Sequence, residues 1–342
     1  MNEYVKWWKG SLFKDLVREN KKVFHCHLIQ ILPGNRFKHI EEINQKLNLL
    51  LLKIYLFLFK RRTKTLLWLF YPELGFLTKY LPQSESIYDC IDFYTPDSIS
   101  SQAFAKQVKF LLNHATLVTS ISESLKKRVQ KQTLKDIHIV PQGFSTNTFQ
   151  NISQKKTIEQ WKKSSPTIGF VGGINERLDY KLLYSLIKKN PQWQFVFAGP
   201  KGHEPNILKN KNMELFPQIE SLPNFLLLPP RQKSMIGSLI QQFDIAIIPY
   251  DVSYNFNKYC YPMKLFEYFY LEKPVLSTPI QELKRFSSLV KIGNSAEEWE
   301  QNIKEILSKP EPAIVKKRKK ELALENSWER KIEAISTLLL EI

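Results

Sequence analysis

The sequence predicts an α/β protein made of two doubly wound parallel-sheet lobes. The length of 342 residues suits two domains, and chains this long bury most of their surface in ordinary cores. Short apolar segments alternate with segments of helical spacing, which is the pattern of a parallel sheet with helices on both faces. A polar segment rich in lysine, serine and glutamine, 151–165, interrupts this alternation. We therefore expect an N-terminal domain over 1–150 and a C-terminal domain over 151–342.

The N-terminal domain begins with an expected helix around 8–20 and a buried strand at 22–32. Ser122 is expected to cap a basic helix over 123–132, because a serine hydroxyl accepts hydrogen bonds from the N–H groups of a first turn. The remaining elements follow from apolar runs and helical spacing: strands at 66–71, 85–91, 115–121 and 137–140, and helices at 47–59 and 102–114.

In the C-terminal domain a strand at 167–171 leads into Gly172-Gly173, and a helix starts near Asp179. Ligands of such lobes bind at the carboxyl ends of the strands. The run KKRKK at 316–320 lies within a helical pattern, either as a membrane or localisation segment or as a solvated face. The other expected elements are strands at 194–198, 224–228, 244–249, 274–277 and 289–292, helices at 234–242 and 263–271, and a last helix that is a candidate to pack back on the N-terminal domain.

The helix over 47–59 is the most apolar stretch, with 11 apolar residues in 13. It is too short to cross a bilayer, which takes about 20 residues. A basic cluster follows directly, so one interpretation is a helix in the membrane interface with these side chains at the headgroups: Lys60, Arg61, Arg62 and Lys64. The alternative is a helix that is apolar all round because it is buried between layers. No signal peptide opens the chain, so a cytoplasmic location is expected.

The net charge of +17 is unequally distributed, since residues 1–165 carry 26 basic and 13 acidic side chains and residues 166–342 carry 24 and 20. A basic first half favours a polyanionic partner, either nucleic acid or an anionic membrane surface, with solubility alone as the alternative. The 3 cysteines lack CxxC spacing, and His25 and His27 lack a third ligand. A reduced protein without disulfides or a metal site is therefore expected.

Gly172-Gly173 and Arg177 form the first candidate site. Glycines let the backbone come close to a bound group, and the N-terminus of the next helix attracts an anion such as a diphosphate. Arg177 would add a bidentate phosphate contact. The alternatives are a tight turn without a ligand and a surface arginine. The segment is neither a GxGxxG fingerprint nor a P-loop, so a dinucleotide redox enzyme or an NTPase is not supported.

Lys264 and Glu267 form the second candidate site. Pro262 is a favoured first-turn residue, so Lys264 falls in the opening turn of a helix and Glu267 lies three residues later on a neighbouring face. The lysine would neutralise phosphate charge while the glutamate accepts the paired hydroxyls of a ribose. An ordinary surface ion pair is the alternative.

Five segments of the second lobe stand in order as FVGGINERLD, NPQWQFVFAGP, LPNFLLLPPR, FDIAIIPY and PMKLFEYFYLEKPVLSTP. Through them residues 167–283 resemble the nucleotide-binding half of the family 4 nucleotide-sugar glycosyltransferases, which have the GT-B fold of two facing Rossmann-like lobes. The first lobe resembles the family through IYDCIDFY, LVTSISESL and HIVPQGFSTNTF. The resemblance implies a retaining, hexosyl-type transferase that needs no metal or other cofactor.

The resemblance also implies a donor site. In it the two glycines lie against the diphosphate, the arginine and lysine neutralise the charge that grows on the leaving group, and the glutamate holds the ribose. Arg231 would lie near the base. Pro262 and Tyr268 complete the P-x-K-x-x-E-Y helix that also carries the lysine and the glutamate. The implied residues are Gly172, Gly173, Arg177, Arg231, Pro262, Lys264, Glu267 and Tyr268.

Two departures from the family pattern concern Tyr259 and the N-terminus. Many family members carry two glutamates eight positions apart, and the first would fall at Tyr259. The family's opening strand and glycine-rich turn have no counterpart before the first expected helix. Asp89 and Asp92, at the end of a first-lobe strand, are candidates for acceptor or donor-sugar contacts. The alternatives for them are to cap the next helix or to join the lobes.

The sequence thus predicts a cytoplasmic, peripheral membrane glycosyltransferase of surface polysaccharide biosynthesis. Its expected partners are a nucleotide-sugar donor, a lipid-linked or other saccharide acceptor and an anionic membrane surface facing residues 60–64 and 123–132. An inactive glycosyltransferase-like scaffold is one alternative, suggested by Tyr259 and the short N-terminus. A nucleic-acid-binding protein is another, but no helix-turn-helix, RRM, KH or zinc pattern accompanies the charge, so nucleic acid is not expected as a partner.

Overall fold

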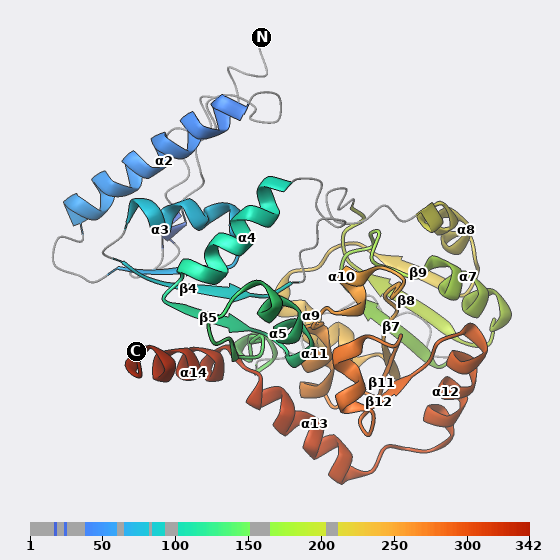
Figure 1. Cartoon of the computed structure of the whole chain (residues 1–342). Coiled ribbons are helices and arrows are strands. Elements are labelled where there is room, and N and C mark those ends of the chain that lie inside the picture. The colour runs from blue at the N-terminus through green and yellow to red at the C-terminus, as the bar shows by residue number, and fades with distance from the viewer. Residues whose placement is uncertain are drawn as a thin grey trace. The chain divides into compact units, whose positions relative to one another are not determined.

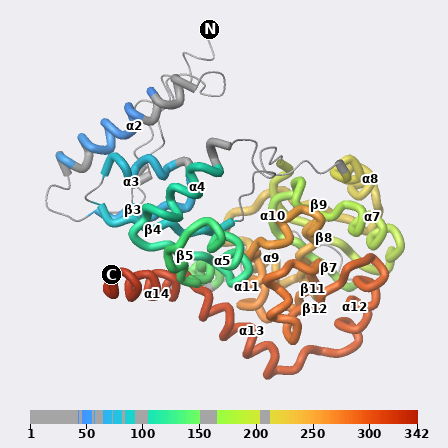
Figure 2. The backbone as a smooth tube through the Cα atoms, viewed as in Figure 1, coloured from blue at the N-terminus to red at the C-terminus, as the bar shows by residue number. Residues whose placement is uncertain are grey.

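The computed structural model describes residues 17–18, 24–25, 38–59, 65–81, 84–92, 102–150, 165–202 and 211–342 of the chain (Figures 1 and 2). The expected linker, the basic cluster at 60–64 and most of the first expected helix and strand lie outside the described residues. The chain divides into two compact units, residues 1–67 with 76–85 and residues 68–75 with 86–342. The domain boundary near residue 150 stays a prediction.

The first unit contains the helices α2 (Lys38–Phe59) and α3 (Phe76–Tyr80) and an antiparallel pair of strands, β1 (Val17–Arg18) and β2 (Phe24–His25). β1 contradicts the expected helix over 8–20, because Val17 and Arg18 pair across the ladder with His25 and Phe24. Among the described helices none is both long and apolar enough to span a membrane.

The larger sheet of the second unit has six parallel strands in the order β12-β11-β10-β7-β8-β9. The order reverses between β7 and β10, and in sheets of this kind ligands bind outside the carboxyl ends of the strands at that point. The strands are β7 (Thr167–Val171), β8 (Gln194–Ala198), β9 (Phe225–Leu228), β10 (Ile245–Ile248), β11 (Val275–Ser277) and β12 (Val290–Ile292).

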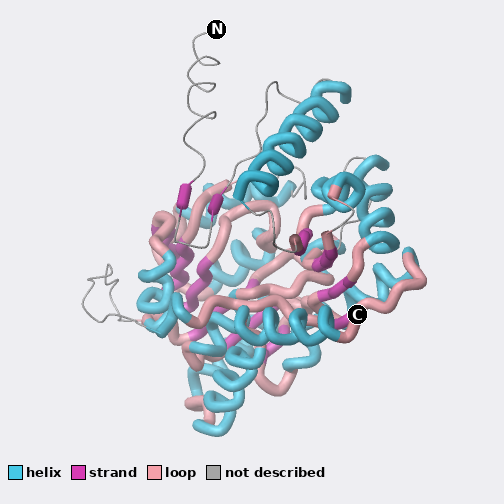
Figure 3. The backbone as a smooth tube through the Cα atoms, turned by 90° about the vertical axis from the view of Figure 1, so that its left-hand side faces the viewer, coloured by secondary structure: helices cyan, strands magenta, loops and turns pink. Residues whose placement is uncertain are grey.

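Helices lie on both sides of this sheet (Figures 1 and 3). Both faces of its central strands are therefore buried, which explains the apolar runs that predicted them. Asp179 caps α7, because its Oδ1 accepts a hydrogen bond of 3.0 Å from the Leu182 N–H. The helices of this part are α6 (Asn147–Gln150), α7 (Tyr180–Lys189), α8 (Phe216–Glu220), α9 (Lys233–Gln241), α10 (Asn255–Lys258), α11 (Lys264–Tyr270) and α12 (Ala296–Ser308), with the 3-10 turns η4 (Lys211–Leu215) and η5 (Gln281–Phe286).

The smaller sheet has the strand order β3-β4-β5-β6, and β5 pairs in parallel with both β4 and β6. The expected cap is present, since Ser122 Oγ accepts a hydrogen bond of 3.2 Å from the Leu125 N–H. The elements are β3 (Leu66–Leu69), β4 (Glu85–Cys90), β5 (Leu117–Ser120), β6 (His138–Ile139), α4 (Gln102–His114) and α5 (Glu123–Val129), with η2 (Pro72–Gly75) and η3 (Gln130–Gln132).

Two further helices close the chain, α13 (Ala313–Glu325) and α14 (Trp328–Leu340). α14 packs on the smaller sheet, where its Ile335 shares a buried cluster with Ile87, Leu117 and Val140. The prediction of a solvated face for residues 316–320 is wrong at one position of α13, because Lys319 is fully buried. Its Nζ lies 2.5 Å from Glu311 Oε1. A buried ammonium needs such a counter-ion.

Candidate functional site

The glycine turn after β7 lies at the point where the strand order of the larger sheet reverses. Gly172 has a φ of +154°, and Gly199, after the neighbouring β8, has a φ of +150°. A Cβ atom at Gly199 would lie 2.0 Å from the Gly172 carbonyl oxygen, and one at Gly172 would lie 3.3 Å from Lys264 Nζ. The turn thus depends on the absence of side chains. It also brings two predicted site residues, Gly172 and Lys264, next to each other.

Arg177 is held by an amide and by two aromatic rings. Its Nε donates to Asn257 Oδ1 at 3.1 Å, while Asn257 Nδ2 donates to the Arg177 carbonyl oxygen at 3.0 Å. The guanidinium carbon lies 4.4 Å from the ring centroid of Tyr250 and 4.9 Å from that of Phe256. Cations are attracted to such π faces. One amide and two aromatic rings thus fix the place of the Arg177 guanidinium.

Lys264, in the first turn of α11, lies against the same tyrosine. Its Nζ donates a hydrogen bond to Tyr250 Oη and lies 4.8 Å from the Tyr250 ring centroid and 5.2 Å from that of Phe170. No ion pair joins Lys264 to a carboxylate among the residues that the structure describes. The structure therefore brings the two predicted cations, Arg177 and Lys264, to one aromatic ring.

Glu267 follows Lys264 by three residues in α11 and is half-buried. Burial raises the pKa of this carboxyl above its usual range, and the charges of Lys264 and Lys233 oppose the rise. The carboxylate thus lies near Lys264 without an ion pair of its own among the described residues. A half-buried acceptor near this lysine suits the hydroxyl contacts expected of it.

The other predicted donor-site residues stay predictions as ligand contacts. Tyr268 is fully buried, and its hydroxyl accepts a hydrogen bond of 3.1 Å from the Val171 N–H, which ties α11 to the end of β7. Pro262 is buried just before α11, Gly173 follows Gly172 in the turn, and Arg231 is half-buried in the segment between β9 and α9.

Asp89 and Asp92, the two first-lobe candidates, lie in different surroundings. Asp89 is fully buried in β4, where it accepts hydrogen bonds from Thr119 Oγ1 and Trp68 Nε1 and forms an ion pair of 2.8 Å with Lys331 of α14. The ion pair joins β4 to α14, which packs on the same sheet, so it tests neither helix capping nor contact between the lobes. The contact of Asp89 with a sugar stays a prediction.

Asp92 acts on the buried thiol of Cys260, as do the two predicted cations. Burial raises the pKa of Cys260, the charges of Arg177 and Lys264 lower it, and the charge of Asp92 raises it. The chemical role of Asp92 stays a prediction.

Tyr259, which departs from the family pattern, lies under an arginine of the basic helix α5. The Arg128 guanidinium carbon is 3.4 Å from the Tyr259 ring centroid. At the other end of α5, the Ser124 N–H donates to Glu282 Oε1 at 3.1 Å. Part of the helix that was expected to face lipid is therefore engaged with residues of the C-terminal half.

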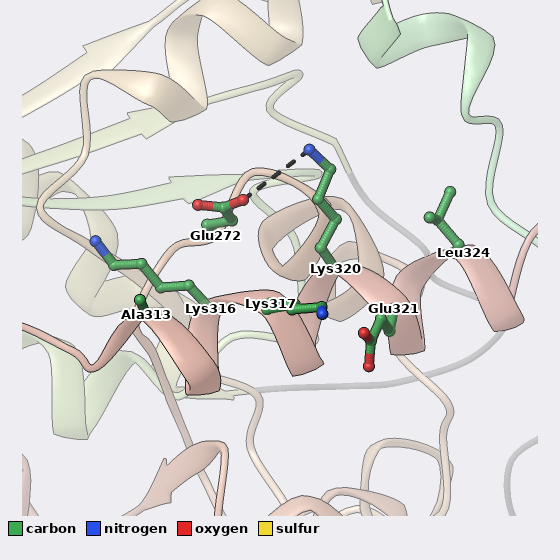
Figure 4. A pocket seen from close by; sticks show the side chains of 7 residues that line it. All are labelled: Glu272, Ala313, Lys316, Lys317, Lys320, Glu321 and Leu324. Carbon is green, nitrogen blue, oxygen red and sulfur yellow. Dashed lines mark ion pairs between the residues drawn. The ribbon is translucent and has the colours of Figure 1, made fainter.

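A hollow of about 270 Å³ lies between α13 and the turn after α11 (Figure 4). Lys320 reaches toward Glu272 across it, with 4.0 Å between Nζ and Oε1. None of the predicted site residues lines this hollow, so it is separate from the candidate site. Among the described residues no group of three or more His, Cys, Asp or Glu side chains is placed to hold a metal ion.

Sequence reasoning missed Tyr250 and Asn257. Tyr250 lies two residues after the end of β10, at the carboxyl end of a strand beside the reversal point, and that position was the signal that could have identified it. Asn257 is fully buried, and its Nδ2 also donates to the Asp251 carbonyl oxygen at 2.9 Å. No sequence pattern indicates Asn257, because its role depends on a loop that folds back on Arg177.

No family model matches the sequence. A protein of Bacillus subtilis (strain 168) named as a teichuronic acid biosynthesis glycosyltransferase, TuaH, is 26% identical over 226 residues. The match covers 62% of this chain and 55% of that protein, so the chain spans about half the length of this curated relative.

Solved structures share the fold over most of the chain. Sucrose-phosphate synthase from Thermosynechococcus elongatus matches with a TM-score of 0.71 at 13% identity, covering 96% of this chain and 85% of that one. A glycosyltransferase from Rickettsia africae matches with 0.65 at 15% identity, covering 92% and 84%. HepE of Anabaena, solved with UDP-glucose, matches with 0.63 at 12% identity, covering 81% and 79%. The predicted fold class is confirmed: the chain has the GT-B fold of two parallel-sheet α/β domains.

Proposed function

We propose that this chain is a nucleotide-sugar-dependent glycosyltransferase, and that its donor site lies at the carboxyl ends of β7 and β10. The observation that carries the proposal is the pair of cations, Arg177 and Lys264, held on the Tyr250 ring beside the Gly172 turn. Two cations fixed at one residue raise the positive potential there, which attracts an anionic ligand. A nucleoside diphosphate is such an anion, and the half-buried Glu267 near Lys264 suits the hydroxyls of its ribose.

The chemistry follows from where charge develops. As the sugar is transferred, the bond between the anomeric carbon and the diphosphate breaks with its electron pair on the diphosphate oxygen, and the acceptor oxygen bonds to that carbon. Cations fixed beside the diphosphate stabilise this growing charge more than they stabilise the ground state. Membership of family 4, a hexosyl donor, retained configuration and independence of metal are parts of the same proposal, supported by the motif order in the sequence.

An acceptor in surface polysaccharide synthesis is supported by the name of the Bacillus subtilis relative, which refers to teichuronic acid. We include in the proposal a lipid-linked or other saccharide acceptor and a peripheral place at an anionic, cytoplasmic membrane face. Asp92 is the first-lobe carboxylate that we assign to acceptor or sugar contacts.

The apolar face of α2 supports the membrane part. Ile43, Leu50, Ile54 and Phe57 are between 46% and 60% exposed, and at about 100° per residue they fall within an arc of roughly 60°. The exposed lysines at positions 46 and 53 lie along one edge of this arc. An apolar stripe with a basic border is suited to the interface of an anionic bilayer.

The donor site is tested by calorimetry on the full chain with UDP, GDP, ADP and CDP. We expect one of them to bind, and Arg177→Met and Lys264→Met each to weaken it about tenfold to a hundredfold, the usual worth of hydrogen bonds to a charged group. The matched control is Lys320→Met, at the separate hollow, which leaves the affinity unchanged. Absence of binding by all four nucleotides would overturn the proposal. Hydrolysis of the matching nucleotide sugar then separates an enzyme from an inactive scaffold.

Cosedimentation with vesicles tests the membrane part. The full chain is expected to bind vesicles that contain phosphatidylglycerol and not vesicles of phosphatidylcholine alone. A triple variant with serine at positions 50, 54 and 57 should lose this binding, whereas Leu134→Ser, which changes a fully exposed leucine outside α2, should keep it. Equal binding to both kinds of vesicle, or wild-type binding by the triple variant, contradicts this part.

A further inference from the structure

Tyr250 occupies a singular place in the candidate site. It is buried, lies two residues after the end of β10 and contacts both predicted cations: its ring centroid lies 4.4 Å from Arg177 Cζ and 4.8 Å from Lys264 Nζ. Its hydroxyl accepts a hydrogen bond from Lys264 Nζ. Phe170 and Phe256 each face one of the two cations. Within the described chain, Tyr250 is the ring that the two cations share.

The backbone of Tyr250 is itself fixed. Thr278 Oγ1, after β11, donates a hydrogen bond of 2.7 Å to the Tyr250 carbonyl oxygen, and Tyr250 forms an antiparallel bridge with Leu178 in the segment that carries Arg177. The ring is therefore attached to the strand ends on one side and to the arginine segment on the other. A residue fixed in this way can transmit its position to the side chains that rest on it.

Two like charges close together repel, and the repulsion grows as water is excluded. The Tyr250 ring attracts the Arg177 guanidinium through its quadrupole, and the hydroxyl of the same residue accepts a hydrogen bond from Lys264, so one residue offsets part of that repulsion. The ring acts on Arg177 and the hydroxyl acts on Lys264. Asn257 holds Arg177 alone, through its 3.1 Å bond with Nε.

We propose that Tyr250 is a positioning residue that sets the places of Arg177 and Lys264 for the second phosphate of a nucleoside diphosphate. The ring positions Arg177, and the hydroxyl positions Lys264. This inference rests on the proposed function, since it assumes that the two cations bind the diphosphate. It adds that their placement is determined by one aromatic residue that needs no contact with the ligand.

Double-mutant cycles on the full chain test the inference, with whichever of UDP, GDP, ADP and CDP binds most tightly. Tyr250→Phe keeps the ring and removes the hydroxyl, so it is expected to weaken the diphosphate about tenfold in the wild type and less than about twofold in Lys264→Met. In Arg177→Met the tenfold effect should persist. Tyr261→Phe is the matched control, because it removes a buried tyrosine hydroxyl that bonds Asn326 at 3.0 Å instead of Lys264.

A second measurement separates positioning from general damage to the fold. Because the cation pair is proposed to bind the second phosphate, Tyr250→Phe should lower the preference for the diphosphate over the monophosphate of the same nucleoside by about tenfold. Loss of structure would weaken both nucleotides equally and leave that preference unchanged. Tyr250→Leu, which also removes the ring, should lower it further.

The outcomes distinguish the two proposals. If Arg177→Met and Lys264→Met themselves leave diphosphate binding unchanged, the proposed donor site is wrong. If they weaken binding but Tyr250→Phe lowers the diphosphate affinity by the same factor in the wild type and in Lys264→Met, the donor site stands and the positioning role of Tyr250 is overturned. An unchanged preference for the diphosphate overturns it as well.

Discussion

Two places in the molecule hold positive charge in opposite ways. In the smaller sheet, Lys331 is fully buried and lies 2.8 Å from the Asp89 carboxylate, which also accepts hydrogen bonds from Trp68 and Thr119. In the larger sheet, Lys264 lies half-exposed against the Tyr250 ring, with no ion pair to a carboxylate among the described residues. The first charge has its counter-ion built into the fold. The second does not.

The difference separates structural charges from functional ones. A buried ion pair is costly to desolvate and costlier to break, but it presents no field to a ligand. Burial lowers the pKa of Lys331 and the charge of Asp89 opposes this, so even its protonation depends on the internal partner. Cations that rest on aromatic faces and amides stay available to an external anion. The two regions should therefore respond differently to the loss of a cation.

The largest effect on stability is expected from Lys331→Met. The change leaves Asp89 as an uncompensated buried charge, which costs about 3–5 kcal/mol of the free energy of unfolding. Denaturant unfolding measures this, and nucleotide affinity should stay the same. Adding Asp89→Asn should restore part of the stability, because it removes the stranded charge. Lys320→Met, at an exposed lysine of α13, is the control and should change stability by less than about 0.5 kcal/mol. A cost below about 1 kcal/mol for Lys331→Met would contradict the comparison.

The opposite response is expected from Glu267→Ala. The truncation removes the acceptor proposed for the ribose, so nucleotide binding should weaken by about 1.5–3 kcal/mol in calorimetry. Stability should change little, because Glu267 has no ion pair among the described residues and its ionised form is disfavoured by burial. Unchanged affinity would remove Glu267 from the site.

The limits of sequence reasoning follow the same division. The strands at 167–171 and 194–198 were predicted at their observed ends, because a run of apolar residues of strand length reports burial on both faces. Arg177, Lys264 and Glu267 were predicted from their places after a strand and in a helix turn. These are local properties of the sequence, so they can be recognised before the fold is known.

The pairing of Asp89 with Lys331 is not local. Its two residues are far apart in the sequence. The last helix was expected to pack back on the N-terminal domain, but no motif indicates that its Lys331 meets Asp89. Asn257 was missed for the same reason, since its contacts exist only after the loop beyond β10 has folded onto Arg177. The cations could thus be predicted, and the groups that hold them could not.

A smaller effect than that of either truncation is expected in the pH dependence of stability, and it is specific to Glu267. Its pKa is raised in the folded protein, so between the ordinary carboxyl value of about 4.3 and the raised value the folded state binds more protons than the unfolded state. The contribution of Glu267 to stability is therefore full below that window and is lost as the pH rises through it. Glu267→Gln should remove this loss. Unfolding curves of both proteins from pH 4 to pH 8 test it, and parallel stability profiles would contradict it.

The smallest effect is expected at Arg128, another cation that rests on an aromatic face. Its guanidinium lies 3.4 Å from the ring centroid of Tyr259, and both side chains are half-exposed, so the coupling between them should be about 0.5–1 kcal/mol. Single truncations do not report this value, because each side chain has other contacts as well. A double-mutant cycle with Arg128→Ala and Tyr259→Leu, measured by denaturant unfolding, isolates the pair.

Lys127→Ala is the matched control for that cycle, since Lys127 is the exposed neighbour of Arg128 and should show no coupling to Tyr259. The coupling also calibrates the candidate site. Tyr250 is buried, and cation–π attraction grows when water is excluded, so the coupling between Arg177 and Tyr250 should exceed that between Arg128 and Tyr259. If the half-exposed pair couples as strongly as the buried one, burial of the Tyr250 ring adds nothing to its attraction for a cation. The contrast with the Asp89 pair then depends only on the hydrogen bonds made by Asn257 and by the Tyr250 hydroxyl.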